Sequence, residues 1–266
     1  MTAKNLKRLN GTNYADLILQ RILQNGEVSV EDLAKDLQVS PSTIRRSLSA
    51  LENQGLLSRT HGGAVLVKHS LYEPFRNVSS FQEQEKERAI EKRLIGLAAA
   101  ELVNDGDVIA IGAGTTTTQV ARSLRHRKGI TVITNAVNIA MELSHREDLT
   151  VRLTGGTLSG TWFALVGTRA IDGIKEFFVD KAFIGADGID LENGLTSNYP
   201  DQAAIHRTMF QRARQKIVVA DHQKIGKTGN SLICSVSEIE ILITDKKAPA
   251  KTIAEFTKKG IKVLQS

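Results

Sequence analysis

A succession of short apolar runs alternating with helical stretches limits the fold of this chain more than any other feature of its sequence. Beyond residue 104, runs typical of strands lie at 108–111, 130–134, 149–153, 181–184, 216–220, 239–244 and 261–264. Stretches typical of helices lie between most of them, at 115–125, 136–144, 166–177, 201–214 and 249–259. Strands separated by helices pair in parallel, and the helices cover both faces of the sheet. This part of the chain is expected to be a Rossmann-like α/β domain with a parallel sheet.

The segment before the sheet predicts a linker followed by one long helix. Residues 68–80 have no clear period and include Pro74, which is typical of a linker. From Phe81 to Val103 the pattern predicts an uninterrupted helix. Its expected buried stripe consists of Ile90, Leu94, Leu97, Ala98 and Leu102. The expected domains are therefore 1–68 and 81–266, joined by a linker at 69–80.

The first 68 residues have the pattern of three short helices and a hairpin. A helical stripe of apolar residues lies at Val30, Leu33, Ala34 and Leu37. Ser40 and Pro41 are typical of the first positions of the next helix. A hairpin turn is expected at 61–63. Two helices joined by a tight turn and followed by a hairpin predict a winged helix-turn-helix.

The polar face of the third helix suits contact with DNA, because hydroxyl and guanidinium groups read base edges and bind phosphates. Residues 1–69 hold 9 basic and 6 acidic side chains, a modest excess that is compatible with phosphate contacts. An arginine pair is also common on a solvated helix face, but the cap, the wing and the local charge together favour DNA. The candidate DNA-binding residues are Ser40, Ser42, Thr43, Arg45, Arg46, Ser49, Arg59 and His61.

A turn rich in glycine and threonine, residues 112–118, follows the first strand of the predicted sheet. Glycine lets the backbone approach an anion, and the helix N-terminus and the hydroxyls supply donors. The turn lacks the third glycine of a dinucleotide fingerprint, because Thr117 stands there. A Walker A loop that began at residue 221 would need glycine there, but the residue is Asp221. This excludes a Walker A loop at that position. The turn therefore predicts a phosphate site, with a plain helix cap as the alternative.

Ligands of parallel α/β sheets bind at the carboxyl ends of the strands. Several polar residues and glycines are expected there, and Asp221 and Lys224 fit either a ligand site or a surface ion pair. Trp162 and Phe163 are predicted to pack in the core or at a subunit contact rather than to stack on a ligand. The candidate ligand-binding residues are Gly112, Gly114, Thr115, Thr116, Thr117, Asn135, Gly156, Asp187, Asp201, His206 and Lys224.

Composition excludes several classes of protein. Cys234 is the single cysteine, which rules out an internal disulfide and a multi-cysteine zinc site. The histidines show no metal-ligand spacing. No apolar run reaches the roughly 18 residues that span a bilayer, and no secretory signal is visible. A cytoplasmic protein without metal, cofactor or membrane contact is expected.

The sequence resembles the DeoR/GlpR-type family of bacterial transcription repressors over nearly its whole length. The resemblance is carried by segments 39–46 (VSPSTIRR), 59–64 (RTHGGA), 114–117 (GTTT), 132–135 (VITN), 154–156 (TGG) and 219–221 (VAD). It implies a winged helix-turn-helix joined to a sensor domain that is similar to ribose-phosphate isomerases. Family members are typically homo-oligomers, which predicts a dimer or tetramer here. They repress sugar-catabolic operons and leave operator DNA when a phosphorylated sugar binds.

Carried onto this chain, the resemblance implies that residues 114–117 hold the phosphate and that Asn135, Gly156, Asp187, Asp201 and Lys224 line a sugar pocket. Two segments depart from the family pattern. Ser47 replaces the usual Asp after the paired arginines, which affects operator choice. The usual Asp-Glu-Ala-Glu-x-Lys-Arg is Asp-Gln-Ala-Ala-Ile-His-Arg at 201–207, which puts the identity of the effector in doubt.

Two other functions fit the same residues. An isomerase-like enzyme acting on sugar phosphates would need an acid/base pair, and Asp187 and Asp201 are available. Ala204 stands where the related isomerases have a carboxylate, which weakens this alternative. An activator would have the same parts as a repressor, because the direction of control depends on where the operator lies.

Overall fold

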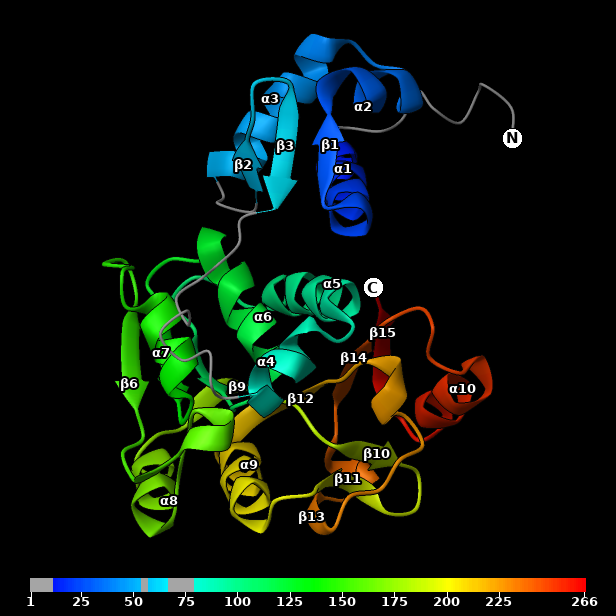
Figure 1. Ribbon diagram of the computed structural model, residues 1–266. Helices are drawn as coiled ribbons and strands as arrows, with labels where there is room; N and C mark the ends of the chain where they lie inside the picture. Colours follow the sequence, from blue (N-terminus) through cyan, green and yellow to red (C-terminus); the bar gives the residue numbers. More distant parts are fainter. Residues whose placement is uncertain (1–11, 54–56, 67–78) are drawn as a thin grey trace. The chain divides into compact units, whose positions relative to one another are not determined.

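The computed structural model describes residues 12–53, 57–66 and 79–266. The chain divides into two compact units, residues 1–73 and residues 74–266. Figure 1 labels the helices and strands of both units. In the described ranges, no helix is long and apolar enough to cross a membrane.

The first unit is a helix-turn-helix with a wing. Its elements are α1 Thr12–Asn25, β1 Glu27–Ser29, α2 Val30–Asp36, α3 Pro41–Asn53, β2 Leu57–Arg59 and β3 Gly63–Leu66. Strand β3 lies between β1 and β2 and pairs antiparallel with both. The Ser29 hydroxyl caps α2 by accepting from the Asp32 N–H at 3.0 Å. The predicted helices and hairpin are confirmed, whereas β1 was missed because its three residues are too few to show a period.

The second unit is built on a parallel sheet of seven strands. The strand order is β15-β14-β12-β9-β4-β5-β6, and every pair is parallel. The strands are β4 Val108–Ile111, β5 Thr131–Thr134, β6 Thr150–Leu153, β9 Val179–Ile184, β12 Ala213–Val219, β14 Ile241–Thr244 and β15 Lys262–Gln265. Each of them overlaps one of the apolar runs, so the predicted parallel sheet is confirmed.

Helices cover both faces of this sheet (Figure 1). They are α4 Ser79–Lys86, α5 Ala89–Ala100, α6 Thr115–Ser123, α7 Val137–Leu143, α8 Thr168–Lys175, α9 Pro200–Arg212 and α10 Ala250–Lys258. The strands are apolar on both sides: Ile109 and Ile111 of β4 pack into the core beneath α4 to α7. Ala110, between them, packs into the opposite core with α8, α9 and α10. Burial of both faces explains why the strands read as continuous apolar runs.

Two small antiparallel sheets lie beside the main one, and the sequence did not predict them. Strands β7 Thr157–Ser159 and β8 Ala164–Val166 form a hairpin. Strands β10 Gly188–Asp190, β11 Gly194–Ser197 and β13 Ser231–Cys234 form the other sheet. Strands of three or four residues are too short for alternation to reveal. Both sheets follow carboxyl ends of main strands and build walls around the region where a ligand is expected.

The predicted single helix from residue 81 to 103 is wrong, because the chain breaks between α4 and α5. Arg88 lies in the left-handed region at the break, with φ 52° and ψ 38°. The predicted linker at 69–80 is described only at 79–80, which begin α4, since 69–78 lie outside the described residues.

The buried face of α5 also differs from the predicted stripe. Its buried residues are Lys92, Ile95, Gly96, Ala99 and Ala100, whereas the five residues of the predicted stripe are only partly buried. Small residues face α6 because the two helices pack closely: a Cβ on Gly96 would lie 2.6 Å from the carbonyl carbon of Gln119. Because α5 and α6 pack closely, the face of α5 with small residues is buried, and the leucine-rich face is only partly buried.

Candidate ligand pocket and nucleic-acid interface

Helix α3 presents a polar face to solvent in the first unit. Ile44, Leu48 and Leu51 are buried and fix the orientation of the helix. Arg45 and Arg46 are exposed on the opposite side. The second helix of a helix-turn-helix enters the major groove with its N-terminal residues, which is where these arginines lie.

Several hydroxyls of the candidate DNA-binding set are engaged within the protein. The Ser40 hydroxyl caps α3 by accepting from the Thr43 N–H at 3.2 Å, and it lies 2.7 Å from the Ser42 hydroxyl. The Ser49 hydroxyl accepts from Nη1 of Arg59 at 2.9 Å, and the Arg59 N–H donates to Oε1 of Glu52 at 2.9 Å. Ser49 thus holds the wing against the recognition helix.

The recognition helix and the wing share one shallow depression. Arg45 from α3 lines it together with Arg59 and His61 from the wing. All three side chains are exposed. Two guanidinium groups and an imidazole at one surface provide donors for phosphates and base edges.

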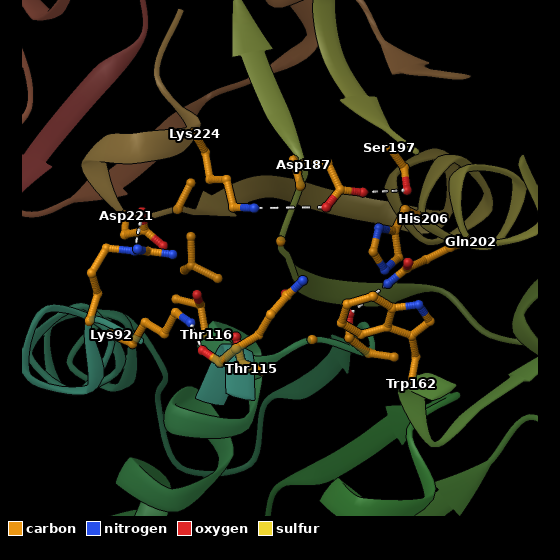
Figure 2. A pocket seen from close by; sticks show the side chains of 18 residues that line it. Lys92, Thr115, Thr116, Trp162, Asp187, Ser197, Gln202, His206, Asp221 and Lys224 are labelled. Atoms are coloured by element: carbon orange, nitrogen blue, oxygen red, sulfur yellow. Dashed lines mark hydrogen bonds and ion pairs between the residues drawn. The ribbon is translucent and has the colours of Figure 1, made fainter. Parts of the chain in front are cut away.

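The second unit contains a pocket at the carboxyl ends of β4, β9 and β12 that is open to solvent. Figure 2 shows Lys92 and Asp221 on one side and His206, Gln202 and Trp162 on the other. The side chains and backbone that line it belong to Gln84, Arg88, Lys92, Ala113, Gly114, Thr115, Thr116, Trp162, Gly185, Ala186, Asp187, Ser197, Gln202, His206, Val219, Ala220, Asp221 and Lys224.

The N-terminus of α6 opens into this pocket. Gly114, Thr115 and Thr116 line it. The backbone at Gly114 has φ 155°, a conformation that L side chains rarely adopt. The first N–H groups of a helix have no partner within it and attract anions. The hydroxyls of Thr117 and Thr118 donate to the Gly114 carbonyl at 2.9 and 2.8 Å, which leaves those two side chains engaged inside the turn.

Cationic side chains from α5 and from the break before it face the same space. Lys92 is 3% exposed, and its ammonium donates to the backbone carbonyl of Gln84. Burial lowers the pKa of Lys92 to about 8. The Nε atom of Arg88 lies 3.2 Å from Oδ1 of Asp221, a carboxylate that is 1% exposed. A buried cation near an orphaned helix N-terminus favours an anionic ligand.

A second group of polar side chains lines the side formed by β9 and β11. Asp187 accepts from the Ser197 hydroxyl at 3.0 Å and from the Asn198 N–H at 2.8 Å. Its other oxygen lies 3.8 Å from Nζ of Lys224. Three cationic and two anionic side chains line the pocket, so it carries one net positive charge while His206 is neutral.

Buried polar atoms around the pocket lack hydrogen-bond partners within the described residues. They are both ring nitrogens of His206, Nε1 of Trp162, Oδ2 of Asp221 and Nε of Arg88, which has an ion pair but no hydrogen bond. Burial lowers the pKa of His206 to about 4, so its imidazole is neutral near pH 7. A buried polar group without a partner costs free energy, and a ligand with hydroxyl groups would satisfy these atoms.

Six of the predicted ligand-binding residues line the pocket: Gly114, Thr115, Thr116, Asp187, His206 and Lys224. Thr117 is turned into the first turn of α6, as described above. Gly112 lies behind His206, because a Cβ there would be 2.6 Å from Nε2 of that imidazole. Gly112 therefore makes room for a pocket residue rather than lining the pocket.

Three further predicted residues lie outside the lining. The Asn135 side chain is fully used inside the protein: Oδ1 accepts from the Ala113 N–H at 3.0 Å and Nδ2 donates to the Leu165 carbonyl at 3.1 Å. Gly156 packs against the end of β8, since a Cβ there would lie 2.6 Å from the Val166 carbonyl oxygen. Asp201 is exposed in the first turn of α9. Asn135 and Gly156 support the walls of the pocket.

Sequence reasoning missed several lining residues. Gln84, Arg88 and Lys92 come from α4, α5 and the break between them, which no strand-end rule points to. Gln202 lines the pocket next to Asp201 and donates to the Ala113 carbonyl at 3.0 Å. Trp162 is 8% exposed, as core packing predicts, yet it also lines the pocket. No sequence signal singles out Lys92, because Glu91 and Arg93 flank it on the same helix.

Among the described residues, neither a cysteine nor a metal-binding cluster belongs to the pocket. No cluster of three His, Cys, Asp or Glu side chains suited to a metal is found in the part of the chain that the structure describes. Cys234 is buried outside the pocket, and burial raises the pKa of its thiol to about 12, so it is unreactive.

Comparison with known protein families matches both units. Residues 15–70 match the family model described as a DeoR-like helix-turn-helix domain. Residues 87–246 match the model described as the DeoR C terminal sensor domain.

Two curated relatives resemble the chain over most of its length. The HTH-type transcriptional repressor GlcR of Bacillus subtilis is 37% identical over 86% of this chain and 86% of its own. The glycerol-3-phosphate regulon repressor of Escherichia coli is 32% identical over 96% of each chain. Among solved structures, ribose 5-phosphate isomerase A of Methanocaldococcus jannaschii matches 50% of this chain and 53% of its own, with 20% identity and a TM-score of 0.37.

Proposed function

The chain belongs to the DeoR family of helix-turn-helix transcriptional regulators, and from this premise we propose that it represses a sugar or polyol catabolic operon and leaves its operator when a phosphorylated sugar or polyol binds the sensor pocket. The observation that carries the proposal is the pocket at the start of α6, where a helix N-terminus faces buried Lys92. Because the chain belongs to a family of transcriptional regulators, it is not an enzyme, and the isomerase alternative no longer applies.

The phosphate is proposed to bind at the start of α6. The N–H groups and hydroxyls of Thr115 and Thr116 supply neutral donors, and Lys92 supplies a charge. Hydrogen bonds with one charged partner contribute about 1.5 to 3 kcal/mol each, roughly twice the value for neutral pairs. The Escherichia coli relative is named as the repressor of a glycerol-3-phosphate regulon, which supports a phosphorylated effector.

The hydroxyl groups of the effector are proposed to bind across the pocket from the phosphate. Oδ2 of Asp221 needs a donor, and Nε1 of Trp162 needs an acceptor. A neutral imidazole such as that of His206 both donates and accepts. A hydroxyl group can do the same, so a polyhydroxylated molecule meets all three requirements at once.

The operator is proposed to be bound by a homo-oligomer, a dimer or a tetramer. A single recognition helix reads only a few base pairs, and repeated half-sites raise both affinity and selectivity. Two-fold symmetric half-sites spaced by whole turns of DNA, about 34 Å each, fit a pair of such helices. Arg45, Arg46, Arg59 and His61 are proposed to contact the DNA, with Ser42 and Thr43 beside them.

Intrinsic fluorescence provides a direct test of the pocket, because Trp162 is the only tryptophan of the chain and lines the site. Titration of the full-length protein with sugar and polyol monophosphates is expected to change its emission, whereas the matching unphosphorylated compounds leave it unchanged. The same effector should release labelled DNA from upstream of the protein's own gene in an anisotropy assay. An effector that favours the DNA-free state about 100-fold supplies about 2.7 kcal/mol of coupling. Equal responses to phosphorylated and unphosphorylated compounds would contradict the proposal.

The affinity for the effector is expected to fall as pH rises through about 8. The pKa of Lys92 is lowered to about 8 by burial, so its positive charge is present below that pH and is lost above it. A phosphate monoester is already a dianion above its second pKa of about 6, and His206, with a pKa of about 4, stays neutral throughout. The measurement is a series of Trp162 fluorescence titrations on both sides of pH 8.

A variant without the ammonium group is the control for this pH dependence. Lys92→Met keeps the length of the side chain and removes the titrating group. We expect it to bind the effector more weakly and to show no step near pH 8. If the step persisted in Lys92→Met, another group would be responsible and the place of Lys92 at the phosphate would be wrong.

A further inference from the structure

The break between α4 and α5 is unusual because it contains no glycine. Arg88 takes the left-handed conformation there, which is strained for an L residue. Strained residues of this kind persist only where surrounding contacts hold them, and they gather at ligand sites and switches.

Three contacts hold the break, and each of them uses a charged side chain. Nε of Arg88 lies 3.2 Å from Oδ1 of Asp221, and Nη2 lies 2.7 Å from Oε2 of Glu87. Burial acts to lower the pKa of Arg88, but the carboxylates of Asp221 and Glu87 outweigh it and raise the pKa. Across the break, the Lys92 ammonium of α5 donates to the Gln84 carbonyl of α4. An ion pair and a charge-assisted hydrogen bond thus join α4 to α5 and to the end of β12.

Four of the five residues in these contacts line the ligand pocket, namely Gln84, Arg88, Lys92 and Asp221, whereas Glu87 does not. An anion in the pocket competes directly with Asp221 for the guanidinium group and with the Gln84 carbonyl for the ammonium group. Arginine binds phosphate through two parallel hydrogen bonds, which a single Nε contact to a carboxylate does not match. Asp221 would then accept from a hydroxyl group of the effector.

Helix α4 is the first described element of the second unit, and the chain runs from it through residues 67–78 to the wing. Two further contacts anchor this helix within the second unit: Phe81 is fully buried against Phe163, with ring centroids 5.3 Å apart, and Glu85 pairs with Arg122 of α6 at 2.7 Å. Loss of the contacts at the break would therefore weaken the attachment of the helix through which the second unit is connected to the DNA-binding unit.

We propose that the contact between Arg88 and Asp221 is a latch: it holds the break between α4 and α5 against the end of β12 while the pocket is empty, and an anionic effector opens it by taking Arg88 and Lys92 as its own ligands. This inference rests on the proposed function, because the effector enters the same pocket. It assigns to Arg88 the step that connects ligand binding with the DNA-binding unit.

Hydrogen exchange in the ligand-free, full-length protein tests the latch without any effector. Asp221→Asn removes the negative charge but keeps an oxygen that can cap the Gln223 N–H, which Asp221 now does at 3.0 Å. We expect the amides of α4 to exchange about tenfold faster or more, since removal of one partner of a buried ion pair is destabilising on at least that scale. Asp187→Asn is the matched control, because Asp187 contacts Lys224, Ser197 and Asn198 but no residue of α4. Unchanged exchange in Asp221→Asn, or equal acceleration in both variants, overturns the latch.

A second variant separates the latch from binding. Arg88→Gly removes the guanidinium group, and glycine adopts the left-handed conformation without strain. With inorganic phosphate as the probe, wild-type protein is expected to show altered Trp162 emission and faster exchange in α4. Arg88→Gly should still show the change in Trp162 emission, but at a higher phosphate concentration. Phosphate should no longer accelerate hydrogen exchange in α4 of this variant. A full acceleration by phosphate would overturn the latch. No emission change in wild-type protein would instead contradict the phosphate pocket, while the ligand-free comparison decides the latch independently.

Discussion

Arg45→Ala is expected to weaken operator binding by between about 5-fold and about 150-fold, because one arginine bidentate to a base contributes about 1 to 3 kcal/mol of discrimination. Arg45 is exposed on α3 and shares a surface depression with Arg59 and His61 of the wing. No buried contact is lost, so the fold should be retained. The measurement is fluorescence anisotropy with labelled DNA from upstream of the protein's own gene. Trp162 fluorescence should show unchanged effector binding, since that pocket belongs to the other unit.

Arg21→Ala is the matched control for this variant. Arg21 is an exposed arginine of the same unit, on α1, and pairs with Asp36 at 3.3 Å. The two variants change the net charge equally, so a purely electrostatic loss of affinity would be the same in both. Equal losses would contradict a base-reading role for Arg45. A loss confined to Arg45→Ala, with affinity for unrelated DNA little changed, supports direct readout.

The main elements of both units follow from the sequence because their signals are local. Strands buried on both faces are continuous apolar runs, as in Val108–Ile111, and the helices between them have their own period. The start of α3 is set by Ser40 and Pro41, whose capping chemistry acts within a few residues. The turn at Gly114 is readable for the same reason, since glycine and the following threonines suffice to suggest an anion site.

The remaining features depend on residues that are distant in the sequence. The break at Arg88 is held by Asp221, at the end of a strand far along the chain, so a helical pattern continued through it. Asn135 follows a strand, where ligand-binding side chains are expected, but its amide bonds the Ala113 and Leu165 backbones instead. Sequence position indicates which sheet edge a side chain is near; it does not indicate whether the side chain turns toward the ligand or toward a neighbouring loop.

Thr116→Val is expected to lower the affinity for the phosphorylated effector by about 10-fold to about 150-fold, because a hydrogen bond to a charged group contributes about 1.5 to 3 kcal/mol. Thr116 lines the pocket at the N-terminus of α6 and is 8% exposed. Valine has nearly the same shape, so the helix should form as before. Operator affinity without effector should be unchanged, which makes the variant a repressor that no longer responds at ordinary effector concentrations. Trp162 fluorescence measures the first effect and anisotropy the second.

Thr117→Val tests whether this effect belongs to the Thr116 hydroxyl or to the turn as a whole. The Thr117 hydroxyl donates to the Gly114 carbonyl at 2.9 Å, and the residue is fully buried. Its loss removes one internal hydrogen bond, about 1 kcal/mol of stability, and leaves the ligand donors in place. We therefore expect Thr117→Val to unfold at a lower temperature while its effector affinity stays within about threefold of the wild-type value. If both variants lost effector affinity equally, binding would depend on the intact start of α6 and not on the Thr116 hydroxyl. The proposed direct contact from Thr116 to the phosphate would then be wrong.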